Sequence, residues 1–187
     1  YTNKDITREQ FHAYVKELNL EQSFPGITNL NFAPRVFARD KEKFEAAVRA
    51  DTSLDAHGYP NFSILPSGER AEYHVLTYLE PMETNLVSFG FDMALNKPVA
   101  NALAVSRDRG ELISSGRLIQ IRGPHQHIGM AMRMPLYRRD MPRNTVEERR
   151  AAYFGSVGAG FDINKLMLGA VDKDALRYTR FKLYDVG

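Results

Sequence analysis

Residues Glu111–Tyr137, ELISSGRLIQIRGPHQHIGMAMRMPLY, predict two strands joined by a turn at Gly123-Pro124, and the rest of the chain is organised around this pair. In the second strand, every other side chain is apolar, which is the period-two pattern of a strand in a sheet. One face carries Ile128, Met130, Met132, Met134 and Leu136, and the other carries Gly129, Ala131, Arg133, Pro135 and Tyr137.

The first strand of the pair contains three small residues in a row, Ser114, Ser115 and Gly116. Small residues in a central strand leave room for another backbone or for a ligand. A flexible methionine row beside such a gap is typical of an adaptable pocket floor. The alternative is that the methionines fill an ordinary core, and the residues alone favour that alternative.

The composition indicates a globular protein of one ordinary domain or two small ones, with 43% hydrophobic and 26% charged residues in a chain of 187. A net charge of +2 with interspersed signs argues against a nucleic-acid partner. The absence of cysteine excludes disulfides, thiolate metal sites and a cysteine nucleophile. No apolar run reaches the roughly 18 residues of a membrane span. Because the chain begins at Tyr1 without methionine, we expect a fragment whose flanks carried such segments.

Five helices are predicted from caps and apolar spacing. Thr7 and Gln10 have capping-box spacing ahead of a helix that ends near Leu20, and Thr145 and Glu148 repeat that spacing. The other three helices follow Asp40, Asn96 and Asp162, and the second of these ends at Gly110.

The predicted strands outside the central pair are Ile27–Phe37, Phe62–Leu65, Tyr73–Leu79, Tyr153–Phe161 and Leu176–Tyr184. Pro34 makes the first of them an edge or irregular strand. Mixed strand and helix order with hairpins predicts an α+β fold with antiparallel sheets rather than a doubly wound fold. The polar, arginine-rich composition after Tyr137 marks a boundary between subdomains.

No enzyme signature is present. His125 and His127 could hold a metal with one carboxylate, but no supporting ligand spacing follows, so a polar turn is favoured. Gly155–Gly160 fits neither a nucleophile elbow nor a phosphate loop. We therefore expect a protein that is not an enzyme, with no catalytic residue, metal site or cofactor. A small hydrolase that uses scattered Asp, His and Ser is the least favoured alternative.

The order of several short motifs resembles a CHASE domain over roughly Phe11 to Tyr184. The motifs are Phe24-Pro25-Gly26-Ile27, Phe32-Ala33-Pro34-Arg35-Val36, Phe44-Glu45, Tyr78-Leu79-Glu80-Pro81 with Asn85, Phe89-Gly90-Phe91-Asp92, Pro135-Leu136-Tyr137, Glu147-Glu148-Arg149 and Gly155 to Phe161-Asp162.

The resemblance implies a long N-terminal helix followed by two PAS-like subdomains. The expected parts are residues 1–57 as a helical and linker region, 58–137 as the membrane-distal, ligand-binding subdomain and 138–187 as the membrane-proximal subdomain, with strands from 24–37 as a candidate addition to the last. It also implies the periplasmic or extracellular part of an inner-membrane receptor, between transmembrane helices that this fragment lacks, and a homodimer in the full-length receptor.

In the plant cytokinin receptors of this family an aspartate anchors the hormone, and the matching position here is Asp92. The small and polar pocket lining of those receptors falls near Ser114 and His125, with Ser114 where a leucine would stand. From the residues themselves, a pocket of apolar walls with a few polar groups could also draw on further side chains. The predicted ligand-binding residues are Asp92, Ser114, His125, Tyr78, Phe91, Arg117, Met130 and Met132.

The resemblance, together with the absence of catalytic motifs, implies a ligand-sensing domain of a membrane-bound histidine kinase or diguanylate cyclase that binds a small molecule of unidentified structure. The alternative is a dimerisation or spacer module without a ligand of its own, in which the apolar stripe from Phe11 to Leu18 would form the dimer seam.

Overall fold

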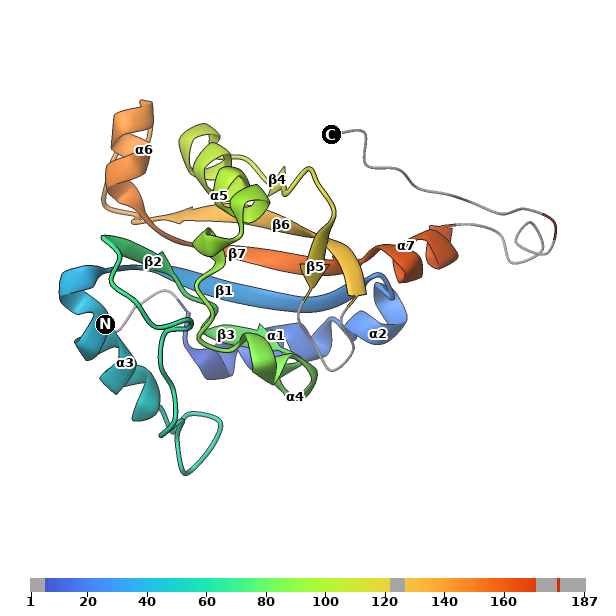
Figure 1. Cartoon of the computed structure of the whole chain (residues 1–187), viewed down its shortest axis with the longest axis horizontal. Helices are drawn as coiled ribbons and strands as arrows, with labels where there is room; N and C mark the ends of the chain where they lie inside the picture. The colour runs from blue at the N-terminus through green and yellow to red at the C-terminus, as the bar shows by residue number, and fades with distance from the viewer. Residues whose placement is uncertain (1–5, 122–126, 171–177, 179–187) are drawn as a thin grey trace.

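The computed structural model describes residues 6–121 and 127–170, together with Tyr178. Its centre is an antiparallel sheet in which β7 (Tyr153–Asp162) lies between β1 (Ile27–Phe37) and β6 (His127–Tyr137), as Figure 1 shows. The full order is β2-β1-β7-β6-β4, with β3 also paired to β1 and β5 also paired to β6. The predicted α+β class with antiparallel strands is confirmed.

The strand β1 is central, so the edge alternative of its prediction is wrong, whereas an irregularity is present as a register shift between Ile27 and Asn29. It pairs with β7 on one side and with β2 and β3 on the other. The carbonyl of Pro34 accepts a hydrogen bond from Val75 N at 3.2 Å, so the position of its missing N–H also faces the β2–β3 side. There the ladder is interrupted between His74 and Tyr78, and the proline is tolerated at that gap.

Two predicted strands are divided and one is not formed. The segment predicted over Tyr73–Leu79 becomes β2 (Glu72–His74) and β3 (Tyr78–Glu80). The first strand of the central pair becomes β4 (Ile113–Ser114) and β5 (Ile119–Ile121). Residues 62–65 form only an isolated bridge, between Leu65 and Phe91.

All five predicted helices are present. Thr7 and Gln10 form the predicted capping box at α1 (Arg8–Glu17), and Thr145 and Glu148 form another at α6 (Val146–Ala152). Asn96 caps α5 (Lys97–Arg109), which ends at the left-handed Gly110. Asp162 accepts two backbone N–H bonds at the start of α7 (Ile163–Ala170). At α3 (Lys41–Arg49), Asp40 is the N-cap residue without a side-chain cap bond.

Short helical segments complete the described chain. They are α2 (Leu20–Ser23), η1 (Ala38–Asp40), α4 (Met82–Asn85), η2 (Leu86–Ser88) and η3 (Met93–Leu95).

The sheet has two covered faces, because successive residues of β1 enter different apolar clusters. Ala33 packs with Leu79, Val99 and Leu103 under α5. Phe32 packs with Phe11 and Val15 of α1. In Figure 1, α5 lies beside β6 and α1 lies at the other end of the strand order, beside β3.

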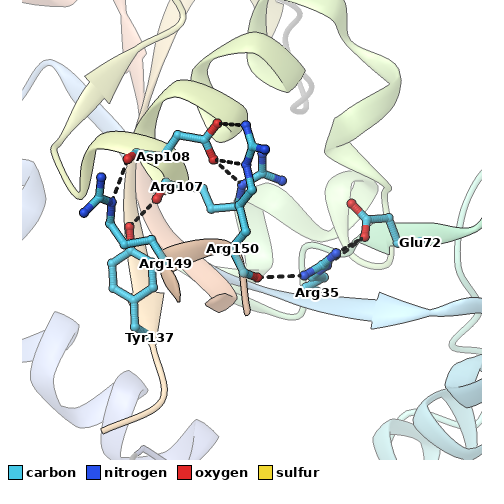
Figure 2. Close-up of polar contacts among 7 residues, drawn as sticks. All are labelled: Arg35, Glu72, Arg107, Asp108, Tyr137, Arg149 and Arg150. Carbon is cyan, nitrogen blue, oxygen red and sulfur yellow. Dashed lines mark hydrogen bonds and ion pairs between the residues drawn. The ribbon is translucent and has the colours of Figure 1, made fainter. Parts of the chain in front are cut away.

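A cluster of arginines joins α5 to α6 and both to the sheet (Figure 2). Arg150 donates to the carboxylate of Asp108 at 3.0 and 2.6 Å, and Arg149 donates to the Asp108 carbonyl at 2.6 Å. Arg35 on β1 pairs with Glu72 on β2 at 2.5 Å and donates to the carbonyl of Arg150 at 3.3 Å. These contacts fix the position of α6 relative to β1 and β2.

The predicted boundary after Tyr137 falls between β6 and β7, which are hydrogen-bonded from Gly129–Asp162 to Tyr137–Tyr153. One sheet therefore runs across it. The division into two PAS-like subdomains stays a prediction. The predicted strand Leu176–Tyr184 lies outside the described residues, except for the exposed Tyr178.

Candidate functional site

A cavity of about 480 Å³ lies between the sheet and the segments that cover it on the α5 side. We call it the sheet cavity. Its polar floor comes from Asn29, Asn31 and Arg133, and its lid comes from η2, η3 and the start of α5. The apolar part of the wall consists of Leu76, Leu79, Val87, Phe91, Met93, Val99, Ile119, Ala131 and Ala159. Such a volume is ordinary for a small-molecule site.

Strand alternation brings the polar floor together. Asn29 and Asn31 are two residues apart on β1, so both face the cavity. Arg133 reaches them across β7, because Gly158 lies opposite Arg133 in the ladder. A Cβ at Gly158 would lie 2.3 Å from the Arg133 guanidinium, and one at Gly160 would lie 2.8 Å from Asn29 Nδ2. The two glycines therefore leave space for these polar groups.

Arg133 is 1% exposed, and its hydrogen-bond partners are neutral. Nε and Nη2 donate to Ser156 Oγ at 3.2 and 2.6 Å, Nη2 donates to the Ser156 carbonyl at 2.9 Å, and Nη1 donates to Asn31 Oδ1. Among the described residues, no carboxylate forms an ion pair with it. Burial lowers the pKa of the Arg133 guanidinium to about 10, which is well above neutral, so the group stays charged.

A chain of amides continues from Arg133 along the floor. Asn31 Nδ2 donates to Asn29 Oδ1 at 2.7 Å, and Asn29 Nδ2 donates to Asn85 Oδ1 at 3.1 Å. Asn85 Nδ2 then donates to the carbonyl of Pro81 at 2.8 Å. The guanidinium only donates, so it fixes which way each amide faces.

The structure places Asp92 beside the sheet cavity rather than on its wall. The side chain is fully buried, and Oδ1 accepts from the backbone N–H groups of His74 at 3.0 Å and Ala94 at 3.2 Å. Arg70 Nε lies 3.0 Å from Oδ2, but the N–H does not point at the oxygen, so this contact is an ion pair rather than a hydrogen bond. Asp92 thus has three partners within the protein.

His74, next to this aspartate, is buried and neutral. Burial is the main cause that lowers the pKa of its imidazole to about 4. Its Nδ1 is buried without a hydrogen-bond partner among the described residues, as is the hydroxyl of the neighbouring Tyr153. These groups lie outside the sheet cavity.

The predicted ligand-binding residues are not brought together in one place. Phe91 lines the sheet cavity. Met130 and Met132 alternate with Ala131 and Arg133, so they face the opposite side of the sheet. Ser114 is half-buried on β4, Arg117 is exposed in the following loop, Tyr78 lines a second cavity, and His125 lies outside the described residues.

The second cavity, of about 560 Å³, lies on the α1 face of the sheet, between the start of α1 and α3. Arg8 lines this cavity and is 4% exposed. Its Nε is 2.7 Å from Asp51 Oδ2, and Nη1 donates to the Thr77 carbonyl at 2.8 Å. Its guanidinium carbon lies 4.5 Å from the ring centre of Tyr59 and 4.8 Å from that of Tyr78.

Within the described ranges, no group of three His, Cys, Asp or Glu residues could hold a metal ion. Within the same ranges, no helix combines the length and apolarity that a bilayer crossing requires. The sheet cavity offers hydrogen-bond donors, one charge and apolar walls, which is an arrangement suited to binding.

Comparison with known proteins agrees with the sequence resemblance. The CHASE domain family pattern matches residues 4–187. "Probable histidine kinase 4" of Oryza sativa subsp. japonica is 25% identical over 163 residues, which cover 87% of this chain and 15% of that protein. "Probable histidine kinase 5" of the same organism is 24% identical over 193 aligned positions, which cover 97% of this chain and 16% of that protein. The chain therefore spans about a sixth of the length of these relatives.

Proposed function

Because this chain belongs to the CHASE domain family, we propose that it is the ligand-binding part of a membrane-bound signalling protein and that the sheet cavity holds the ligand. CHASE domains are extracytoplasmic sensory domains of receptors such as histidine kinases. The proposal adds a location for the ligand and the strands through which binding would change the positions of neighbouring helices.

The observation that carries the proposal is the sheet cavity itself. It combines a fully buried guanidinium, an ordered chain of amides and a largely apolar wall. A buried guanidinium without a carboxylate partner costs stability, so a core that served packing alone would not place one beside a cavity.

The strands under the cavity supply the route. β7 contributes Ala159 and Gly160 to the cavity and leads directly into α7. β1 contributes Asn29 and Asn31, and its other face packs on α1. A ligand that binds one arrangement of these strands better than another shifts the population toward that arrangement. The elements that respond would then be α1 and α7.

We further propose that the chain lies in the periplasm or outside the cell, that transmembrane helices flank it in the whole protein, and that the output is a kinase or a cyclase. The histidine kinase relatives support the kinase. The homodimer stays part of the proposal, but α1 buries Phe11 and Val15 against the sheet. A dimer through α1 would therefore use its outer face, where Tyr14 is 59% exposed.

A thermal-shift screen of small molecules with the purified chain tests the proposal. Ligand at about 100 times its dissociation constant adds roughly 2.7 kcal/mol, or roughly 5–10 °C in Tm for a chain of this size. Ala131→Leu places a larger side chain in the sheet cavity and is expected to abolish the shift. Ala151→Leu makes the same change on the exposed side of α6 and should leave the shift intact.

A ligand whose shift survives Ala131→Leu would bind elsewhere, and the assignment of the sheet cavity would be wrong. If no compound stabilises the chain and the chain sediments as a stable dimer, the spacer alternative is favoured.

A further inference from the structure

The sheet cavity contains one positive charge that nothing in the described protein balances. Arg133 is held by a hydroxyl, a carbonyl and an amide oxygen, all neutral. Asp92 is also fully buried, but Arg70 is its ion-pair partner. A buried, unpaired ion is costly because the protein interior solvates it poorly. A bound anion would remove that cost.

The neighbouring amides also offer donors rather than acceptors. A guanidinium has no acceptor, so the oxygen of Asn31 must face Arg133 and its nitrogen must face away. Because the Asn31 nitrogen can only donate, the oxygen of Asn29 faces Asn31 and the nitrogen of Asn29 faces Asn85. Asn31 Nδ2 and Arg133 Nη1 each use one N–H on a described partner and have a second. The floor is therefore positive and rich in N–H groups.

The rest of the cavity wall indicates the polarity of the part of the ligand that does not contact Arg133. None of the described residues that line the sheet cavity is Asp or Glu. Above the floor the wall is formed largely by aliphatic and aromatic side chains, including Phe91, Val99 and Ile119. Such a wall favours an apolar or aromatic body, since burying apolar surface drives its binding.

We infer that the ligand of the sheet cavity is a small organic acid, whose carboxylate binds the N–H groups of Arg133 and Asn31 while its apolar body fills the wall. The inference rests on the proposed function and narrows it to one class of ligand. A single negative charge matches the single guanidinium, whereas a phosphate dianion would leave a buried excess of negative charge. The acid therefore binds as a monoanion.

The test compares acids with their amides on the whole chain. The probes are benzoate with benzamide and phenylacetate with phenylacetamide, extended to larger matched pairs, and inorganic phosphate alone. Each is titrated by calorimetry and by thermal shift. At least one acid should bind about 30-fold or more tightly than its amide, because the amide lacks the charge that Arg133 needs. Inorganic phosphate should bind weakly or not at all.

Asn31→Asp is the decisive variant, because it places a carboxylate of nearly the same shape against Arg133. Its carboxylate balances the charge of Arg133 but cannot donate to Asn29 Oδ1, so Tm without ligand should stay within a few degrees of the wild-type value. Acid binding is expected to weaken by about 100-fold. Asn101→Asp adds the same charge on the exposed side of α5 and should change neither Tm nor acid binding. A readout of Tm without ligand shows that Asn31→Asp is folded, which Arg133 substitutions cannot guarantee.

The outcomes separate the two levels of the argument. If amides bind in the cavity as tightly as their acids, or if Asn31→Asp leaves acid binding intact, the inference is wrong and the proposed function stands. If inorganic phosphate binds more tightly than every acid, the carboxylate class is wrong. If no acid, no amide and no compound of the wider screen binds, the inference and the proposed function both fail.

Discussion

The two cavities lie on opposite faces of one sheet, and each has a buried arginine. Arg8, on the α1 face, is paired with Asp51 at 2.7 Å and stacks on Tyr59 and Tyr78. Arg133, on the α5 face, has only neutral partners among the residues that the structure describes. The two side chains are 4% and 1% exposed, so burial does not distinguish them.

The difference lies in the counter-charge. The buried pair of Arg8 and Asp51 balances its charge within the protein and connects α1 to the Asp51 loop and Thr77, although Arg8 Nη2 is buried without a hydrogen-bond partner among the described residues. A buried cation that lacks a carboxylate is incomplete, and a ligand can complete it. The proposed site is therefore distinguished by the missing counter-charge among the described residues rather than by the size of its cavity.

The largest expected effect is that of Arg133→Ala. The substitution leaves a void above Gly158 and removes the Arg133 N–H groups that donate to Ser156 and Asn31, and these losses outweigh the relief from removing a buried charge. The free energy of unfolding should therefore fall by about 3 kcal/mol. Urea unfolding of this variant measures the loss. Arg117→Ala, in an exposed loop, is the control and should change it by less than about 0.5 kcal/mol. A loss below about 1 kcal/mol for Arg133→Ala would mean that the guanidinium is not held as described.

Arg8→Ala is expected to cost about 2 kcal/mol, because the Thr77 bond and the aromatic contacts are lost while Asp51, 25% exposed, can be hydrated. Binding in the sheet cavity should be unchanged within about twofold if the two arginines have different roles. Arg39→Ala, which removes a surface pair at 3.7 Å, serves as the control for charge. A large loss of binding in Arg8→Ala would break the distinction between the two cavities.

The smallest effect concerns Asp108. In contrast to Arg133, which has no carboxylate partner among the described residues, the Asp108 carboxylate lies between two guanidinium groups. Hydrogen bonds from Arg150 and then Arg107 hold the pKa of its carboxyl well below the usual value of 3.8. The contribution of Asp108 to the free energy of unfolding is therefore fully present above about pH 4. It is lost as the pH falls from the pKa of the unfolded chain toward the lower pKa of the folded protein. Because the cluster is partly exposed, Asp108→Asn should cost only about 1 kcal/mol at pH 7.

Urea unfolding of wild type and Asp108→Asn at pH 7 and pH 3 should show the difference shrinking with acid. Asp140→Asn, in the exposed loop before α6, is the control. A difference that grows on acidification would contradict the ion-pair account.

Sequence patterns predicted the helices well because their signals are local. Thr7 with Gln10, Asn96 with Gly110 and Thr145 with Glu148 act over three residues or one helix, and the structure contains each of these caps. The position of β1 could not be predicted in the same way. Pro34 suggested an edge or irregular strand, but the gap between β2 and β3 that accommodates it depends on residues some 40 positions away.

For the candidate site, too, local patterns could be predicted from the sequence and contacts between distant residues could not. Alternation along β6 predicted its two faces. The methionine face was one candidate for a pocket floor, beside the favoured interpretation of core filler, and the sheet cavity is lined by Ala131 and Arg133 of the other face. A charged residue between two methionines in an apolar strand was the available signal for Arg133. Nothing local linked it to Asn31, because their contact spans 102 positions of sequence.

The sequence by itself determined the class of fold, the helix ends, the periodicity of the central strands and the family, since caps, alternation and ordered motifs are written in neighbouring residues. Only the tertiary structure decided which face of β6 lines a cavity, which buried charge has a partner and which does not. Those properties depend on contacts between β1, β6 and β7, which are distant in the chain. A charge is balanced or unbalanced only by what folding brings beside it.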